Sequence, residues 1–158
     1  MPYRPDPDSF GFLVTDVARL IRSEMDRRIG LAGLGLTASE ARTLTHAARA
    51  GAVRQNVLAE RMGVEAMTLS GALDRLEARG LVERRPDPTD RRAKLVHLTE
   101  KTDGILSRIA PISAGIRADV SLGIDPDDWK CLLDMLKTAR ANLQAVKSEA
   151  SGEESDVA

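Results

Sequence analysis

Five basic side chains lie within the segment RRPDPTDRRAK, which occupies positions 84–94. The cations are Arg84, Arg85, Arg91, Arg92 and Lys94. Only two acidic residues, Asp87 and Asp90, stand among them, although the whole chain of 158 residues has a formal net charge of −1. Guanidinium and ammonium groups bind phosphates and carboxylates through charge-assisted hydrogen bonds. The segment is therefore a candidate anion-binding surface, and a solvated charged loop is the alternative.

Few other residues have types and spacing that support chemistry. Cys131 is the only cysteine, which excludes an internal disulfide framework and fits a reducing cytoplasm. It precedes Leu132 and Leu133 in a helical pattern, so we expect a buried, unreactive thiol rather than an oxidant sensor. His46 and His97 lie far apart, without cysteines or carboxylates at ligand spacing, so neither a metal site nor a cofactor is expected. No phosphate-binding glycine loop, nucleophile elbow or pair of catalytic carboxylates is present, and an enzyme is not expected.

The composition is that of a soluble globular chain with a helical core. Hydrophobic residues make up 42% and charged residues 30%, whereas aromatic residues make up only 3%. A core built from Leu, Ile, Val, Ala and Met favours helices. No apolar run approaches the roughly 20 residues that span a bilayer, and the start MPYRPDPDSF has no signal-peptide pattern. We expect one domain, or one subunit of a small assembly, in the cytoplasm, with no membrane partner.

Helical periodicity dominates the first half of the chain. Four helices are predicted, over residues 9–29, 37–51, 54–63 and 64–80. Ser9 is a plausible N-cap of the first, and Thr37 or Ser39 of the second, while Gly51 and Gly80 are natural stops. The periodicity then changes to that of two short strands, LVERR and KLVHLT, which the basic segment joins through Pro86 and Pro88.

After Thr99 the helical pattern returns. Isoleucines and one valine recur at steps of three and four residues, at positions 105, 109, 112, 116 and 120, and these are core or subunit-interface residues. Asp125 is a predicted N-cap, with Pro126 at the first position of the last helix. The final residues, KSEASGEESDVA, are polar and acidic, so we expect a disordered tail.

The fourth helix has two different faces. Leu69, Leu73 and Leu76 share the inner face, which leaves Met67, Thr68, Ser70, Gly71, Asp74 and Arg75 on the outer face. A helix held in this way by a preceding helix can lie in a DNA major groove. The basic hairpin can then reach the neighbouring minor groove, where cations meet a strongly negative potential. These features together predict a winged helix-turn-helix with residues 84–94 as the wing.

The residues 58–100, LAERMGVEAMTLSGALDRLEARGLVERRPDPTDRRAKLVHLTE, resemble the multiple-antibiotic-resistance regulator (MarR) family of bacterial transcription factors. The D-x-R pattern of that family's wing is here Asp90-Arg91-Arg92, and GLTASEARTL matches the start of its second helix. The resemblance implies a mainly α-helical fold with a small β-hairpin. The implied parts are a flexible lead (1–8), an N-terminal dimerisation helix and loop (9–36), a winged helix-turn-helix (37–98), C-terminal dimerisation helices (99–147) and a disordered acidic tail (148–158).

The resemblance also implies which residues touch DNA. The start of the fourth helix would face the bases, Arg92 would enter the minor groove, and Arg91 and Lys94 would contact the backbone. Arg75 would contact a phosphate or pair with the wing. The expected DNA-binding residues are thus Glu65, Ala66, Met67, Thr68, Ser70, Gly71, Arg75, Arg91, Arg92 and Lys94.

The start of the fourth helix departs from the family's usual pattern. Many members begin it with Ser-Pro-Ser or Ser-Gln-Ser and carry an arginine where Gly71 stands. Here Glu65 and Met67 replace small polar residues. Arginine on guanine is the commonest specific base contact, so its absence removes one source of base discrimination. Gly71 would allow a closer approach to DNA, with Met67 against a thymine methyl.

A crevice between the dimerisation helices and the DNA-binding part is the family's usual effector site, and it takes a small aromatic carboxylate or phenol. Such a ligand needs a cation. Arg19, Arg22 and Arg42 are candidates, with His46 as a hydrogen-bond partner, although each could equally be a surface residue. The scarcity of aromatic residues predicts an aliphatic wall.

The leading hypothesis is a homodimeric, sequence-specific regulator of transcription that binds double-stranded DNA. It would act as a repressor released by a small ligand, on a pseudo-palindromic operator with half-sites about 10 base pairs apart. The alternative is a winged-helix module for protein–protein contact, without specific DNA binding.

Overall fold

The computed structural model describes the backbone of residues 4–155 and the side chains of residues 4–148. The chain divides into two compact units, residues 1–117 and residues 118–158. The elements in order are α1 (Phe10–Leu31), α2 (Ala38–Ala50), β1 (Val53–Arg54), α3 (Gln55–Met62), α4 (Ala66–Ala78), β2 (Val82–Pro86), β3 (Lys94–Leu98), a 3-10 turn (Glu100–Thr102), α5 (Asp103–Val120) and α6 (Pro126–Ser155). The predicted fold class, mainly α with a small β-hairpin, is confirmed, and the sheet has one strand more than expected.

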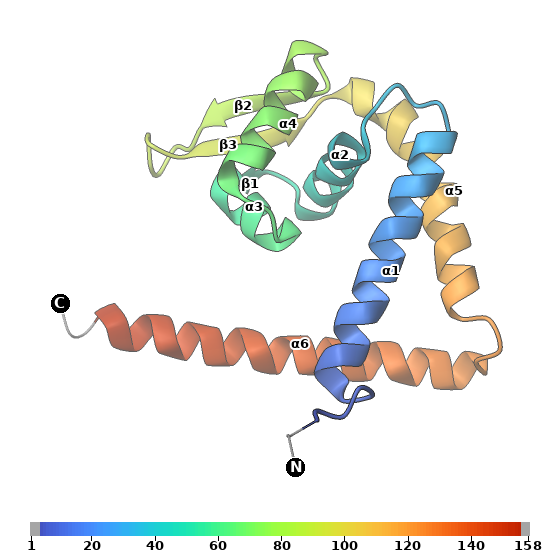
Figure 1. Cartoon of the computed structure of the whole chain (residues 1–158). Helices are drawn as coiled ribbons and strands as arrows, with labels where there is room; N and C mark the ends of the chain where they lie inside the picture. Colours follow the sequence, from blue (N-terminus) through green and yellow to red (C-terminus); the bar gives the residue numbers. More distant parts are fainter. Residues whose placement is uncertain (1–3, 156–158) are drawn as a thin grey trace. The chain divides into compact units, whose positions relative to one another are not determined.

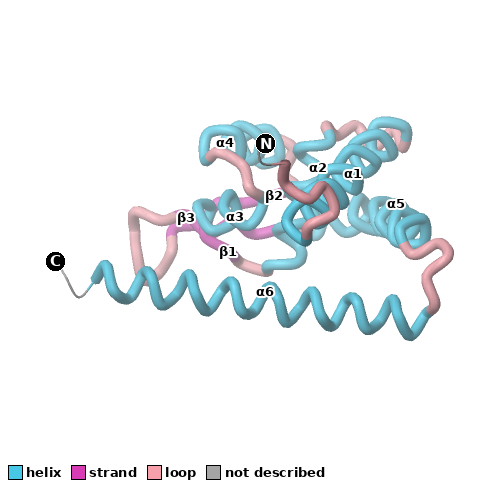
Figure 2. Tube along the Cα trace, turned by 60° about the horizontal axis from the view of Figure 1, so that its bottom comes forward, coloured by secondary structure: helices cyan, strands magenta, loops and turns pink. Residues whose placement is uncertain are grey.

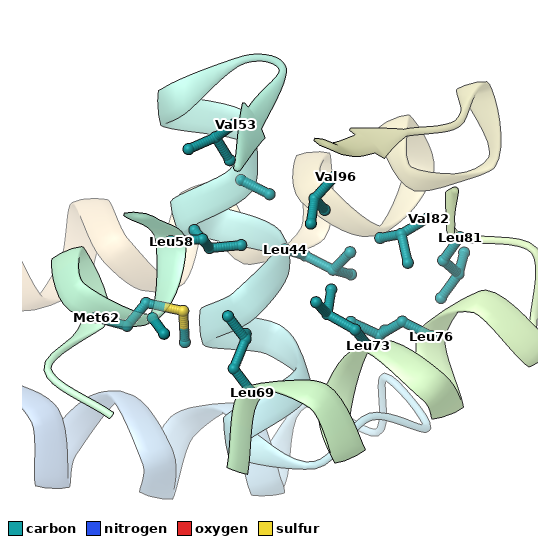
Figure 3. Close-up of a cluster of buried hydrophobic side chains, with 12 residues drawn as sticks. Leu44, Val53, Leu58, Met62, Leu69, Leu73, Leu76, Leu81, Val82 and Val96 are labelled. Atoms are coloured by element: carbon teal, nitrogen blue, oxygen red, sulfur yellow. The ribbon is translucent and has the colours of Figure 1, made fainter. Parts of the chain in front are cut away.

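The main core of the first unit lies where α2, α3 and α4 pack against the sheet (Figures 1 and 3). Leu69, Leu73 and Leu76 of α4 are at most 1% exposed, as their helical spacing predicts. They cluster with Leu44 of α2 and Val96 of β3. Burial of each such side chain contributes about 1.5–3 kcal/mol. This packing fixes which face of α4 turns inward and leaves the opposite face to solvent.

The sheet is antiparallel with strand order β1-β3-β2. Its first strand, β1, pairs Val53 with Val96 of β3, and the sequence did not predict it because two residues are too few for a periodic signal. The expectation that Pro86 belongs to the loop was wrong by one position, since it is the last residue of β2 and pairs with Lys94. Proline is tolerated there because β2 is an edge strand.

A second cluster joins α1, α2 and α5 within the first unit. Ile29 of α1, Ala41 of α2 and Ile109 of α5 are at most 2% exposed and pack together with Leu34. Both views show α1 and α5 side by side (Figures 1 and 2). Three of the predicted isoleucines, at positions 105, 109 and 112, therefore serve the core of this unit.

Helix α2 begins with a capping box at Thr37, which decides between the two N-caps that the sequence allowed. The Glu40 backbone N–H donates to the Thr37 hydroxyl (3.2 Å), and the Thr37 N–H donates to the Glu40 carboxylate (3.0 Å). The helix ends at Gly51, as predicted.

The second unit consists largely of α6, which starts at Pro126 behind Asp125 as predicted. The Asp127 N–H donates to the Asp125 carboxylate (2.8 Å). Residues 148–155 of the tail that the sequence predicts to be disordered are described with the backbone of the last turns of this helix. They contain no proline, although Gly152 lowers the helix propensity there. The rest of the predicted tail, like residues 1–3 of the predicted lead, lies outside the described residues.

Large apolar side chains are exposed on α1 and on α6. They include Phe10, Leu13, Val17, Leu20, Leu132, Leu133, Leu136, Leu143 and Val146. Cys131 is exposed as well, which overturns the prediction of a buried thiol. Its neighbours Leu132 and Leu133 have apolar side chains that the single chain leaves uncovered, so helical periodicity alone did not report burial here. No helix in the described part of the chain is long and apolar enough to cross a membrane.

Candidate nucleic-acid interface and ligand crevice

Helices α3 and α4 form a helix-turn-helix. The turn contains Gly63, whose backbone is left-handed with φ 63°, a conformation that glycine adopts without a steric penalty. The outer face of α4 and its N-cap are open to solvent. Glu65, Ala66, Met67 and Thr68 are exposed, and Met67 is 87% exposed. The remaining two expected base-facing residues, Ser70 and Gly71, are half-buried.

Arg75 on α4 has a partner that the sequence did not predict. Its Nε donates to the Glu40 carboxylate of α2 at 2.7 Å. Of the two roles expected for Arg75, a phosphate contact or a pair with the wing, the structure shows neither and gives it a partner on α2 instead. The two residues are 35 positions apart in the sequence and lie on different helices. Their contact depends on tertiary packing, which the spacing of residues in the sequence does not show. Glu40 is only 4% exposed; burial alone would raise its pKa, but the hydrogen bonds from Arg75 and the Thr37 N–H lower the pKa below its usual value.

The wing is the hairpin of β2 and β3, and its tip projects away from α2 and α4 (Figures 1 and 2). Its cations fall into two groups. Arg84 donates to Glu77 and Asp74 of α4, both at 2.6 Å, and thereby ties the base of the wing to that helix. Arg85 donates to its neighbour Glu83.

The second group consists of Arg91, Arg92 and Lys94. All three side chains are exposed, and within the described chain none of them forms a side-chain hydrogen bond or an ion pair. The structure thus separates two cations that stabilise the wing from three that remain available to an anion.

Asp90 shapes the tip of the wing. Its carboxylate accepts a hydrogen bond from the Arg92 backbone N–H (3.0 Å), and its carbonyl oxygen accepts one from the Ala93 N–H (2.9 Å). Side-chain acceptance two residues along the chain is the usual way in which an aspartate fixes a tight turn. The D-x-R pattern thus has a local cause, because the aspartate holds the backbone from which Arg92 projects.

Asp87 anchors the other side of the loop. It is buried, at 6% exposure, and its carboxylate accepts from the Thr89 N–H (2.8 Å), the Thr89 hydroxyl (2.7 Å) and Arg54 Nε (2.6 Å). The two bonds from Thr89 and then the one from Arg54 lower the pKa of Asp87 to about 2. Arg54 also donates to the Thr89 hydroxyl at 3.0 Å. The sequence did not predict the bonds between Asp87, Thr89 and Arg54. The one hint of them was the presence of an aspartate within a basic loop.

A hollow of about 440 Å³ lies between the start of α4 and the wing. Ala66 lines it from α4, Asn56 from α3, and Arg92 and Lys94 from the wing. Two of the unpaired cations and the start of α4 therefore border one concave surface together with Asp90. Cations in such a place can neutralise the phosphates of a nucleic-acid backbone.

A second hollow, of about 350 Å³, lies within the first unit among α1, α2 and α5. The apolar part of its wall consists of Ala, Ile and Met side chains without a Phe, Tyr or Trp, as the scarcity of aromatic residues suggested. Its lining residues are Ala18, Ile21, Arg22, Met25, Ile29, Ala41, Arg42, Thr45, His46 and Ile109. Three of the four residues expected to bind an effector thus line one crevice. The fourth, Arg19, is outside this lining and pairs with Asp16 (3.1 Å) on the exposed surface.

The polar part of the crevice is positively charged. Arg42 is engaged by Asp26 (3.2 Å), whereas Arg22 forms no ion pair within the described chain. Burial of His46, with Arg49, Arg42 and Arg22 near it, lowers the pKa of its imidazole. The crevice can therefore accept an anionic group next to an aliphatic wall. Elsewhere among the described residues, no three His, Cys, Asp or Glu side chains gather as a metal site.

A helix-turn-helix followed by a basic two-stranded wing defines a winged helix-turn-helix protein. Comparison with known proteins agrees. A family model described as the MarR family matches residues 34–93. The crystal structure of the transcriptional regulator PA3341 is 39% identical, with a TM-score of 0.72, and the match covers 86% of this chain and 98% of that one. The chain belongs to the MarR family of transcriptional regulators.

Other solved structures share the fold. A crystal structure of MarR is 24% identical, with a TM-score of 0.76 over 93% of this chain and 99% of that chain. A transcriptional regulator of the MarR family from Rhodococcus sp. RHA1 is 27% identical, with a TM-score of 0.70 over 87% and 96% of the two chains.

Proposed function

We propose that this protein is a homodimeric, sequence-specific regulator that binds double-stranded DNA and acts as a repressor relieved by a small ligand. The observation that carries the proposal is the pairing of an exposed recognition face on α4 with three unpaired cations on the adjacent wing. The start of α4 lies in a major groove, and Arg92 enters the neighbouring minor groove. Arg91 and Lys94 neutralise phosphates, and Arg75 reaches a phosphate with the guanidinium nitrogens that Glu40 leaves unused.

Dimerisation is supported by the apolar side chains exposed on α1 and α6. Each of these two long helices exposes several large apolar side chains, a feature that marks interaction surfaces, and two-fold dimers are the commonest assembly. A two-fold dimer recognises a pseudo-palindrome with half-sites about one helical turn apart. Light scattering of the purified protein tests this point directly, and a monomer at micromolar concentration would contradict it.

Ligand relief is supported by the crevice among α1, α2 and α5. The family resemblance and the cation Arg22 favour a small aromatic carboxylate. The ligand acts on DNA binding only if it has different affinities for two arrangements of the protein. Benzoate is a suitable probe: it should weaken DNA binding by the native protein, and Arg22→Ala should remove that effect without changing DNA affinity in its absence. No effect of benzoate, phenol or salicylate at millimolar concentration would argue against this crevice as an effector site.

The decisive experiment for DNA binding is the selection of bound fragments from a library of the source organism's genomic DNA at physiological salt. We expect a pseudo-palindrome with one-turn half-site spacing. Arg92→Ala should lower the affinity for all DNA by about 1–2 kcal/mol and reduce the salt dependence by about one contact. Arg85→Ala is a matched control, since Arg85 is an arginine of the same hairpin that already pairs with Glu83. Wild-type affinity in Arg92→Ala would remove the wing from the mechanism.

One observation favours a second candidate, a module for protein–protein contact. The outer face of α4 presents Met67, and α4 carries Asp74 and Glu77 against the single cation Arg75. An absence of selected DNA, together with affinity for duplex that does not fall with salt, would favour this function, because neutralisation of phosphates gives a slope of about −0.9 per contact.

A further inference from the structure

The outer face of α4 is the part of the DNA-facing surface whose side chains differ most from what base recognition usually employs. An arginine or lysine that donates to guanine O6 and N7 is the commonest specific contact in a major groove. Helix α4 contains one cation, Arg75. Its guanidinium is turned to α2 by the bond to Glu40, and the next arginine, Arg79, donates to the Gly35 carbonyl oxygen at 2.8 Å.

The acidic residues near this face do not supply a donor to guanine either, because an ionised carboxylate only accepts hydrogen bonds. Asp74, one turn beyond Ser70, is bonded to Arg84, and the same arginine holds Glu77. Glu65 at the start of the helix is an acceptor when ionised. Residues 65–71 themselves therefore offer hydroxyls, a carboxylate and apolar groups, and the cation beside them, Arg75, is held by its Nε to Glu40.

Met67 is the side chain that projects most from this face. It is 87% exposed, although it is a large apolar residue, and Ala66 beside it is exposed too. One turn further, at the i+4 position, stands Gly71. A Cβ added at Gly71 would meet only the Arg75 Nη1, at 3.6 Å. Gly71 itself adds no side chain beside Met67, and the group nearest to this point is the end of the flexible Arg75 side chain.

We propose that Met67 reads sequence by packing against the C5 methyl of a thymine in each operator half-site, in place of arginine on guanine. The proposal rests on the proposed function and specifies its base readout. Thymine is the only ordinary base with an apolar group at the major-groove edge. The thioether chain is unbranched and polarisable, so it adapts its shape to such a group. Gly71 permits the close approach that this short contact requires.

The test uses the full-length protein and the duplex recovered by genomic selection, with fluorescence anisotropy as the readout. Each thymine in turn is replaced by deoxyuracil, which removes only the C5 methyl and leaves all hydrogen-bonding groups in place. At one thymine of each half-site we expect an affinity loss of about fourfold for the native protein, which corresponds to one buried methyl of about 0.8 kcal/mol. In Met67→Gln this uracil effect should disappear, whereas in Met67→Leu it should persist.

The controls separate base readout from stability and from backbone contact. Met67 is almost fully exposed, so its substitution should leave the thermal midpoint unchanged. Leu31→Gln removes another exposed apolar side chain, at the end of α1, and should keep the uracil effect. Arg92→Ala should weaken binding to the thymine and uracil duplexes equally.

Four results would overturn the inference. A specific duplex with no uracil-sensitive thymine would refute it and leave the proposed function standing, as would uracil sensitivity that survives in Met67→Gln. Loss of affinity with 7-deazaguanine that disappears in Arg75→Ala, without a uracil effect, would assign the readout to Arg75. Recovery of no specific duplex would reject the proposed function and the inference together, since a reader of bases must select a sequence.

Discussion

At the scale of single residues, the two aspartates of the wing act on the wing itself. By charge alone they would weaken DNA binding, yet each accepts hydrogen bonds that hold the loop in one conformation. Asp90 accepts from the Arg92 N–H, and Asp87 accepts from Thr89 and Arg54. The wing is thus ordered before it meets an anion, so binding loses less conformational entropy than it would with a flexible loop.

Asp90 provides a test of this role. Asp90→Ala removes the acceptor of the Arg92 N–H, so we expect DNA affinity to fall roughly two- to tenfold, the equivalent of one hydrogen bond of about 0.5–1.5 kcal/mol. Asp90→Asn retains an oxygen at the same place and should bind DNA at least as tightly as the native protein. Anisotropy titrations of both variants measure this. An equal loss in the two variants would show that the carboxylate charge, and not the acceptor, matters.

At the scale of elements, α2 connects the crevice with the recognition helix. One part of its surface, with Ala41, Arg42 and His46, lines the crevice. Another part, at Glu40, holds Arg75 of α4. Glu40 is next in sequence to Ala41 of the crevice wall, so under the proposed function a ligand that displaces α2 would act on α4 through this carboxylate.

The start of α2 can be tested by itself. Thr37→Ala removes half of the capping box and should lower the free energy of unfolding by about 1 kcal/mol, because one backbone N–H loses its acceptor. Ser39→Ala, the other cap that the sequence allowed, should have little effect. Urea denaturation of both variants at one protein concentration decides between them, and a larger loss in Ser39→Ala would contradict the observed cap.

The elements also show which information the sequence contains. The inner face of α4 was predictable, because Leu69, Leu73 and Leu76 repeat with the period of a helix. Strand β1 was not, since its two residues are paired only through a strand that lies 40 residues later. The same reason hides the bond between Arg75 and Glu40 and the one between Arg54 and Asp87. The exposure of Cys131 escaped prediction because an apolar helical stripe looks the same whether or not its own chain covers it.

For the whole molecule, the ion pairs give stability a definite dependence on pH. Hydrogen bonds from Arg27 and then Arg28 lower the pKa of Glu24 to about 2, and that of Asp87 is also about 2. A hydrogen bond from Arg84 lowers the pKa of Glu77 as well. Each carboxylate favours the folded state above its unfolded pKa, near 4.5 for Glu and 3.8 for Asp, and this stabilisation is lost as the pH falls toward 2.

The imidazole of His46 adds a separate step at higher pH. Its lowered pKa means that the unfolded chain takes up the proton first, so the free energy of unfolding should already decline as the pH falls below 6.5. We expect urea titrations between pH 8 and pH 3 to show two descending regions. His46→Gln should remove the upper one and keep the lower one. A flat profile between pH 7 and the lower region in the native protein would contradict the burial of this side chain.

The pairing of β1 with β3 has a consequence for how new operators can be recognised. Because Val53 pairs with Val96 and Arg54 is bonded to Asp87, the start of α3 cannot rotate without carrying the wing with it. The helix-turn-helix and the wing therefore meet DNA as one rigid body, at a fixed angle between the two grooves. A change in base specificity must then come from substitutions of the side chains on α4 and the wing, while the backbone arrangement stays the same. Under the proposed function, the distance between two such bodies in a dimer is the remaining geometric freedom, and a change in that distance would alter operator binding without any change in the bases that each body reads.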